Sequence, residues 1–194
     1  KDNIESTATV DGRIDRVKVK TPDDYVMPPG GLNIRVGDQA LDKEARLHDH
    51  KRAAILAFAR ANKLDRIVTS GGPDPKIGII TTGKSYLDVR AAMEALGIDE
   101  IKANQLGLRL YKVGMPWPLE PEGVRQFAVG LEEIFIVEER REIVENQVKQ
   151  ELFNWRDDVR PRIVGKMDDH EKRFLTFAAE LSVASLASSL SERL

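Results

Sequence analysis

The sequence contains no cysteine. Disulfides, thiolate nucleophiles and iron–sulfur clusters held by cysteine ligands all require that residue. None of the three can therefore be built from these 194 residues, and any redox centre that works with this chain must lie outside it.

Long hydrophobic runs and an excess of charge of one sign are also missing. No apolar run approaches the length that crosses a bilayer, and the first residues, KDNIESTATV, lack the basic start and apolar core of a signal peptide. The 30 basic and 32 acidic side chains leave a net charge of -2, which gives no overall field to attract nucleic acid or an anionic membrane. We expect a cytoplasmic globular chain with neither partner, and a start at Lys1 without methionine suggests a piece of a longer protein.

The first 38 residues have little helical or strand patterning. Pro22, Pro28, Pro29 and the Gly30-Gly31 pair interrupt them, and only the short alternation from Ile14 to Val19 is typical of an edge strand. We therefore expect an extended arm or interdomain linker over residues 1–38, followed by one α/β domain over residues 39–194.

The rest of the chain alternates between helical and strand-like segments. From Leu41 to Asn62 an apolar stripe recurs at helical spacing, and the turn cluster SGGPDP follows it. Four short apolar runs then predict strands: KIGIITT, LRLYKVG, EIFIVEE and RPRIVGK. The segments between them predict helices: one from Tyr86 to a stop at Gly97, one starting at Pro121, one carrying Val144, Val148 and Leu152, and a last one over about Glu180–Leu190. This order predicts a three-layer α/β/α sandwich with a mostly parallel sheet.

The stretch GIITTGKS satisfies the spacing G-x-x-x-x-G-K-[ST] of a phosphate-binding P-loop. However, Ile79 and Ile80 are β-branched and suit a strand better than a loop that wraps phosphates. We therefore interpret Gly83 as a close approach between strand and helix. The amides of Gly83, Lys84 and Ser85 form a weaker candidate site for an anion or phosphate at the helix start. The rival interpretation is a small NTPase that uses Gly78–Ser85 together with the acidic strand end Glu138-Glu139.

Three stretches carry a resemblance to a known family: PPGGLNIR, GIITTGKSYLDVRAAMEALGID and LRLYKVGMPWPLEPEGVRQFAVGLEEIFIVEERREIVENQVK. Together they resemble one segment of the indolepyruvate ferredoxin oxidoreductases, over roughly Met27–Lys166. In that family the segment is similar to the transketolase carboxyl-terminal domain, a three-layer α/β fold. The phrase KVGMPWPLEP, with FIVEE behind it, is the most specific part.

The resemblance implies that the full enzyme oxidatively decarboxylates indolepyruvate or other aryl 2-oxoacids. It implies thiamine diphosphate with magnesium, 4Fe-4S clusters, coenzyme A as acyl acceptor, ferredoxin as electron acceptor and a homo-oligomeric assembly. The family's GDG motif for the diphosphate does not occur here, and neither do cluster cysteines. No catalytic residue is carried over to this chain, so we expect an inactive scaffold that contacts other domains of the same polypeptide.

A few residues remain as candidates for contacts or ligands. We expect Met115 and Trp117, in a proline-stiffened loop, to anchor a neighbouring domain. Glu138 and Glu139 also belong to this candidate interface, and we expect them to pair with Arg140 and Arg141. His48-Asp49-His50 is interpreted as a solvated helix face with no metal, because residues two apart on a helix diverge. A stand-alone interaction module built around Trp117 is the third interpretation.

Overall fold

The structure is a computed structural model that describes residues 16–194. Its strands are β1 (Arg66–Ser70), β2 (Ile77–Thr82), β3 (Leu108–Val113), β4 (Glu133–Val137) and β5 (Arg162–Val164). Its helices are α1 (Ala40–Arg46), the π-helical turn η1 (Leu47–Lys51), α2 (Arg52–Ala61), α3 (Gly83–Ala95), α4 (Glu100–Gln105), α5 (Pro121–Ala128), α6 (Ile143–Leu152) and α7 (Val183–Ser191). All four strands and all five helices expected from the sequence are present.

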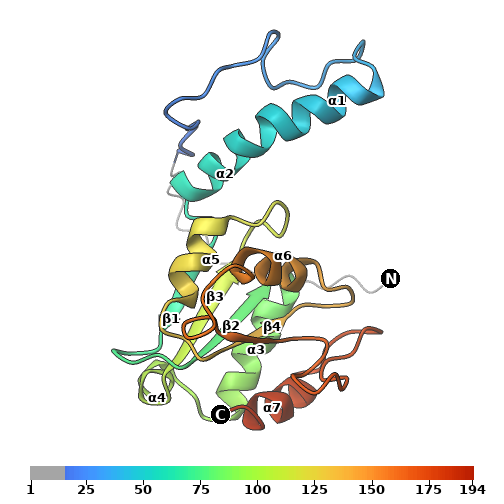
Figure 1. Ribbon diagram of the computed structural model, residues 1–194. Coiled ribbons are helices and arrows are strands. Elements are labelled where there is room, and N and C mark those ends of the chain that lie inside the picture. The colour runs from blue at the N-terminus through green and yellow to red at the C-terminus, as the bar shows by residue number, and fades with distance from the viewer. Residues whose placement is uncertain (1–15) are drawn as a thin grey trace.

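The strands form one five-stranded sheet in the order β1-β3-β2-β4-β5 (Figure 1). Strands β2, β3, β4 and β5 run parallel to one another, and β1, at one edge of the sheet, is antiparallel to β3. Parallel neighbours need crossover connections, and α3, α5 and α6 lie in those connections. The expected mostly parallel sheet is confirmed.

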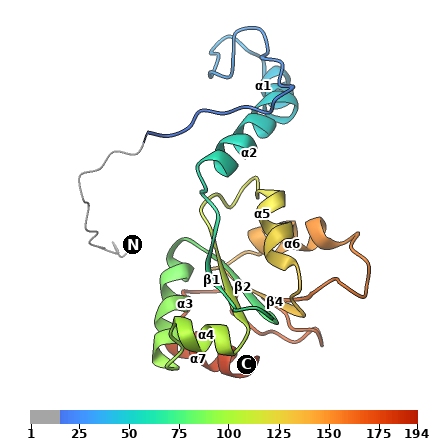
Figure 2. The same ribbon diagram turned by 90° about the vertical axis from the view of Figure 1, so that its left-hand side faces the viewer.

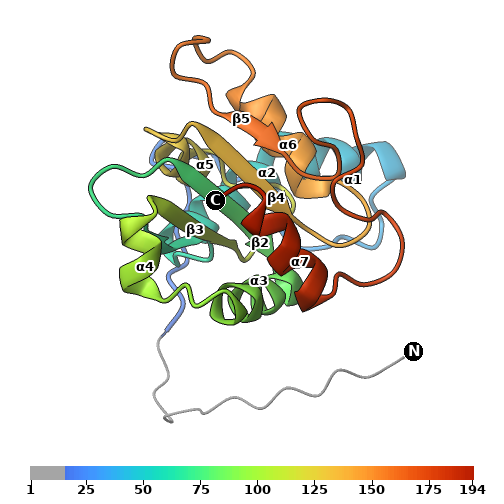
Figure 3. The ribbon, with the colours of Figure 1, turned by 90° about the horizontal axis from the view of Figure 1, so that it is seen from below.

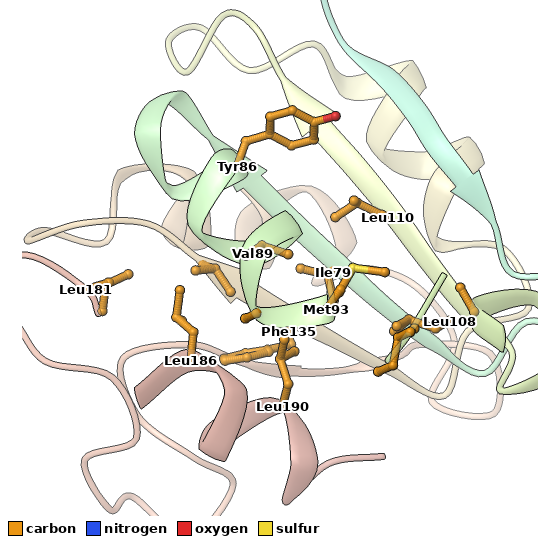
Figure 4. Close-up of a cluster of buried hydrophobic side chains, with 14 of the residues drawn as sticks. Ile79, Tyr86, Val89, Met93, Leu108, Leu110, Phe135, Leu181, Leu186 and Leu190 are labelled. Atoms are coloured by element: carbon orange, nitrogen blue, oxygen red, sulfur yellow. The ribbon is translucent and has the colours of Figure 1, made fainter. Parts of the chain in front are cut away.

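Helices cover both faces of the sheet, which confirms the three-layer arrangement (Figure 3). On one face α3, α4 and α7 pack around buried residues such as Ile79, Leu108 and Phe135 (Figure 4). On the other face α5 and α6 pack against Ile80 and Ile136. The alternation of Ile79 and Ile80 between the two layers follows from the two-residue period of a strand, and the two-sided burial explains why the parallel strands read as continuous apolar runs.

The two glycines of the P-loop-like stretch have different roles from those expected. Gly78 lies inside β2, and a Cβ atom there would come within 2.5 Å of Leu131 Cδ1 and 2.6 Å of Phe127 Cζ. Gly83 has free space around it but a φ of +55°, which favours glycine. The interpretation of Gly83 as a close strand–helix approach is therefore wrong, because the close approach is at Gly78.

Two elements were missed and one was wrongly expected. Strand β1 and the short helix α4 were not predicted. The stretch RIVTS, with polar residues at both ends, is largely exposed except at Thr69, so it lacks the apolar run that marks the other strands. The alternation Ile14–Val19 does not give a strand over residues 16–19, and its first two residues lie outside the described part of the chain.

Helices α1 and α2, with η1 between them, stand away from the sheet. In two views they rise above the α/β unit, and the segment of residues 16–39 runs back along them without helix or strand (Figures 1 and 2). Both buried hydrophobic clusters of the described chain consist of residues beyond position 62. The division into an arm at 1–38 and a domain at 39–194 stays a prediction, since the structure places residues 40–61 beside the arm.

Candidate functional site at the carboxyl edge of the sheet

The carboxyl ends of β2 and β4 are the usual place for a ligand or partner in this type of sheet. The two strands are neighbours, while the helices that follow them, α3 and α6, cover opposite faces. Such a point opens a crevice in open α/β sheets. Gly83 and Lys84 follow β2 there, and Glu138 and Glu139 follow β4.

Lys84 is surrounded by carboxylates at this edge. Its Nζ lies 2.8 Å from Asp88, 3.4 Å from Glu139 and 3.7 Å from Glu180. The hydrogen bond to Asp88, one helical turn away, is the main reason why the pKa of Lys84 is raised above its usual value. The lysine charge is thus matched inside the chain, and the nearby carboxylates would repel a phosphate. The anion site at Gly83, Lys84 and Ser85, of which Ser85 is buried, stays a prediction that these contacts do not favour.

Glu138 is a buried helix cap. It is 4% exposed, and its two oxygens accept hydrogen bonds from the Val144 and Glu145 amides, each at 2.9 Å. These amides belong to the first turn of α6, where an acceptor stabilises the helix. Burial nevertheless raises the pKa of Glu138.

The expected pairing of Glu138 and Glu139 with Arg140 and Arg141 is wrong. Glu138 bonds to the amides of α6, and Glu139 faces Lys84. The sequence could not predict which partners the two glutamates have. The backbone turns sharply after Glu139, where Arg140 has a φ of +59°. Whether a neighbouring domain contacts either glutamate stays a prediction.

Lys166 fixes the chain after β5 to this edge. The side chain is 1% exposed, and its Nζ donates to the backbone carbonyls of Glu138, at 2.5 Å, and Thr176, at 3.0 Å. Its own amide donates to the carboxylate of Glu145 at 2.9 Å. Burial lowers the pKa of the ammonium, while the surrounding glutamates oppose that shift. The buried Lys166 side chain therefore links the segments that contain Glu138 and Thr176, and it is not accessible to a substrate.

The loop after β3 carries Trp117 and is braced from two sides. Asp65, just before β1, accepts hydrogen bonds from the Gly114 amide at 2.7 Å and the Met115 amide at 3.2 Å. Gln147 of α6 donates to the Pro116 carbonyl at 2.8 Å and accepts from the Leu119 amide at 2.9 Å. We call residues 114–119 the Trp117 loop.

These hydrogen bonds hold the backbone of the loop but leave the Trp117 side chain outside the core. Trp117 is 50% exposed, while Met115 is half-buried. Sequence reasoning found this loop but missed Asp65, Gln147 and Lys166, which come from three other segments. Asp65 precedes β1, Lys166 follows β5 and Gln147 lies within α6, and none of these positions identifies the partner of the side chain.

The structure also locates the remaining candidate residues. The run from Ile77 to Thr82 is a strand, so a complete P-loop over Gly78–Ser85 is wrong. His48, Asp49 and His50 lie in η1. No group of three potential metal ligands occurs among residues 16–194, and no helix in that range is long and apolar enough to cross a membrane.

Comparison with known proteins decides the family. Residues 65–193 match the family described as indolepyruvate ferredoxin oxidoreductase middle domain. The chain belongs to this family. The match covers the whole α/β unit and leaves out the arm with α1, η1 and α2.

Named relatives agree with that assignment. The indolepyruvate oxidoreductase subunit IorA of Pyrococcus horikoshii is 40% identical over 84 residues, which are 43% of this chain and 12% of that protein. The corresponding subunit of Thermococcus kodakarensis is 39% identical over 79 residues, 41% of this chain and 11% of that protein. The matched stretch is thus a small part of each relative.

Two solved structures share part of the architecture at low identity. A 2-oxoglutarate:ferredoxin oxidoreductase from Magnetococcus marinus aligns with 76% of this chain and 23% of its own, with a TM-score of 0.46 and 14% identity. A split-gene transketolase aligns with 66% of this chain and 40% of its own, with a TM-score of 0.44 and 12% identity.

Proposed function

We propose that this chain is a non-catalytic domain of an enzyme that oxidatively decarboxylates indolepyruvate or other aryl 2-oxoacids to acyl-CoA, with ferredoxin as electron acceptor. Its role is to hold neighbouring domains in register. The observation that carries the proposal is the Trp117 loop. Asp65 accepts two hydrogen bonds from its backbone, Gln147 accepts one and donates one, and the indole stays half exposed. A rigid, partly exposed aromatic side chain is a typical anchor of an interface.

A 4Fe-4S cluster and a diphosphate at the start of α3 do not fit the residues of this chain. A 4Fe-4S cluster needs cysteine ligands, and the chain has none. At the helix start of α3, a diphosphate would meet Asp88, Glu139 and Glu180 around Lys84. Under this proposal thiamine diphosphate, magnesium, the clusters and coenzyme A belong to other domains, and the isolated chain is inactive.

The test of the interface role compares two exposed aromatic residues in the full-length enzyme. Trp117→Ala removes the anchor, while Phe153→Ala removes a side chain that is 72% exposed just after α6. We expect Trp117→Ala to lower the rate of indolepyruvate-dependent ferredoxin reduction at least tenfold, by disturbing the alignment of domains. Phe153→Ala should stay within a factor of two. Equal rates for the two variants would overturn the role of Trp117.

The size of the native polypeptide tests the assignment to a larger enzyme. An antibody against this chain should detect a band several times larger than 21.7 kDa in its source cells. A band near 21.7 kDa would instead favour a stand-alone interaction module that uses the same loop.

A further inference from the structure

A small cavity lies where the end of α2 meets the start of α5, next to β3. Its volume is about 180 Å³, and its wall includes the buried Ala59, which is 1% exposed. We call it the Tyr111 cavity. The titratable side chains in its wall are Arg60, Lys63, Asp65, Tyr111, Glu120 and Glu122.

Asp65 contributes a carboxylate oxygen that has no hydrogen-bond donor. Its Oδ1 accepts from the amides of Gly114 and Met115, at 2.7 and 3.2 Å, but its Oδ2 is buried and accepts no hydrogen bond from any residue between 16 and 194. A buried acceptor left without a donor is costly. Burial raises the pKa of this carboxyl, the two amides oppose that shift, and the charge of Glu120 adds to it.

The hydroxyl of Tyr111 is a second group without a partner. The side chain is 2% exposed, and its ring packs against Phe127 with 5.1 Å between the ring centroids. The hydroxyl forms no hydrogen bond within the described part of the chain, although a buried tyrosine usually finds a partner for this group. A Cβ at Gly123 would overlap the hydroxyl and would lie 3.1 Å from Glu120 Oε2. Glycine at this position therefore keeps the space between the two oxygens open.

Glu120 supplies a third acceptor and is 4% exposed. Its Oε1 accepts from Arg60 Nη2 at 2.8 Å and from the Glu122 amide at 3.1 Å. Its Oε2 accepts from the Gly123 amide at 2.6 Å, and a carboxylate oxygen can accept two hydrogen bonds. One acceptor position of Glu120 Oε2 is therefore left for a ligand.

The charges around the cavity indicate a cationic ligand. Arg60 pairs with Glu120 and with Glu122, at 2.8 and 3.0 Å, while Asp65 forms no ion pair with a residue of the described chain, the exposed Lys63 included. Water donates hydrogen bonds but leaves a buried carboxylate without a counter-charge. A primary ammonium carries one positive charge and three N–H donors, which matches the single unpaired carboxylate and the three acceptors. A metal ion fits less well, because no group of three potential metal ligands occurs among residues 16–194.

We propose that the Tyr111 cavity binds a primary ammonium group on an aliphatic stem. Asp65 Oδ2, Glu120 Oε2 and Tyr111 Oη accept its three N–H donors, and Ala59 and the ring of Tyr111 contact the stem. A free alkylamine and a lysine side chain of another domain share this chemistry. The site does not depend on the proposed function, because every contact comes from this chain.

The experiment titrates the 194-residue chain with n-butylammonium. Binding is followed by the amide NMR signals of Gly114, Met115 and Gly123, which donate to Asp65 and Glu120. We expect saturable shifts with a millimolar dissociation constant, as suits so small a ligand. Tetramethylammonium has the same charge but no N–H donor, and it should give no saturable shift at the same concentrations.

Three variants test the acceptors. Asp65→Asn keeps an oxygen for the amides of the Trp117 loop but removes the charge, and it should weaken binding at least tenfold. Tyr111→Phe keeps the ring and should weaken binding at least threefold. The control Asp74→Asn changes an aspartate that is 80% exposed and lies outside the cavity wall, and it should stay within a factor of two of the wild type.

The pH dependence separates a direct contact from a structural effect. The ammonium binds the ionised form of Asp65, so binding should weaken as the pH falls and Asp65 takes up a proton. Because the pKa of Asp65 is raised, the midpoint of this loss should lie above 3.8, the ordinary value for an aspartate. Binding that does not change with pH over this range would contradict the contact.

Several outcomes would overturn the proposal: no saturable shift in the wild type, equal shifts with the two ammonium ions, or equal binding by Asp65→Asn and the wild type. Binding by Lys63→Gln but not by the wild type would assign the cavity to the ammonium of Lys63 instead. The source of the ligand follows from a titration of the full-length enzyme. Binding there indicates a free amine, whereas binding to the 194-residue chain alone indicates a lysine of another domain.

Failure of this site is distinguishable from failure of the proposed function. A native polypeptide of 21.7 kDa would remove the larger enzyme and leave the ammonium site in place. The absence of n-butylammonium binding would remove the site and leave the proposed role of the Trp117 loop unchanged.

Discussion

The α/β unit and the helical arm are held in place by different forces. The α/β unit buries an apolar layer on each face of its sheet, with residues such as Ile79, Phe135 and Phe127 at 0% exposure. In the arm of residues 16–39, with α1 and η1, Pro28 is the one buried residue, and the segment is fixed by hydrogen bonds and ion pairs. Burial of apolar area contributes far more than exposed polar contacts to stability.

This difference teaches where each region obtains its stability. The α/β unit has its own core, and the burial of apolar area in that core offsets the conformational entropy that the chain loses on folding. The described part of the arm, together with α1 and η1, lacks such a core and depends on polar contacts within the chain. The boundary of the family match at residue 65 falls at the junction between the two.

The largest effect expected from this comparison concerns Phe135 and Val36. Phe135 of β4 is fully buried between β2 and β5, whereas Val36 of the arm is 95% exposed. Phe135→Ala should lower the free energy of unfolding by about 3–5 kcal/mol, because it leaves a cavity in the core. Val36→Ala should change it by less than about 0.5 kcal/mol. Urea unfolding followed by circular dichroism measures both values, and a loss above about 1 kcal/mol for Val36→Ala would contradict the comparison.

The second-largest expected effect is the loss of stability on replacing a glycine by alanine, and it differs among three positions. Gly78→Ala should cost about 1–3 kcal/mol, because its new Cβ would overlap Leu131 and Phe127. Gly83→Ala should cost about 1 kcal/mol through its positive φ alone. Gly37→Ala, in the arm, has neither a close neighbour nor a positive φ and should stay within about 0.5 kcal/mol. The same unfolding measurement gives the order, and a Gly83→Ala variant less stable than Gly78→Ala would contradict it.

The smallest effect concerns the stability of the fold at alkaline pH. Burial, with help from the charges of Asp65 and Glu120, raises the pKa of the Tyr111 hydroxyl well above its usual value. The folded chain therefore keeps this proton at a pH where the unfolded chain loses it, at about 10. Stability from this group is complete below that pH and falls as the pH rises toward the folded pKa.

Two tyrosine variants measure this effect. Tyr111→Phe should remove the last tyrosine ionisation seen by absorbance at 295 nm and flatten the fall of stability above about pH 10. Tyr25→Phe, which removes a tyrosine of the arm, should leave that late ionisation in place. A late ionisation that survives in Tyr111→Phe would contradict the assignment.

The sequence predicted most of the α/β unit because its elements are marked by local patterns. Ile77–Thr82 and Glu133–Val137 are apolar runs of strand length, and Pro121 begins α5 as expected. The edge strand β1 was missed because RIVTS is exposed at four of its five positions to some degree. The opposite error occurred in the arm, where the alternation Ile14–Val19 is typical of a strand but its described part, residues 16–19, forms none.

For the candidate site too, the sequence predicted the residues better than their contacts. The sequence pointed to Trp117 through its flanking prolines, and to Glu138 and Glu139 through their position after a strand. It could not show that Glu138 caps α6 or that Glu139 faces Lys84, because both contacts join segments that meet only in the folded sheet.

The sequence by itself determined the class of fold, the absence of any cysteine-based chemistry and the family. These depend on residue types and local periods of two and 3.6 residues. Only the tertiary structure decided that Gly78 is the close approach, that Lys166 ties two loops, and that Asp65 and Gln147 brace the Trp117 loop. Those features depend on distances between residues far apart in the chain, and no local pattern encodes such distances.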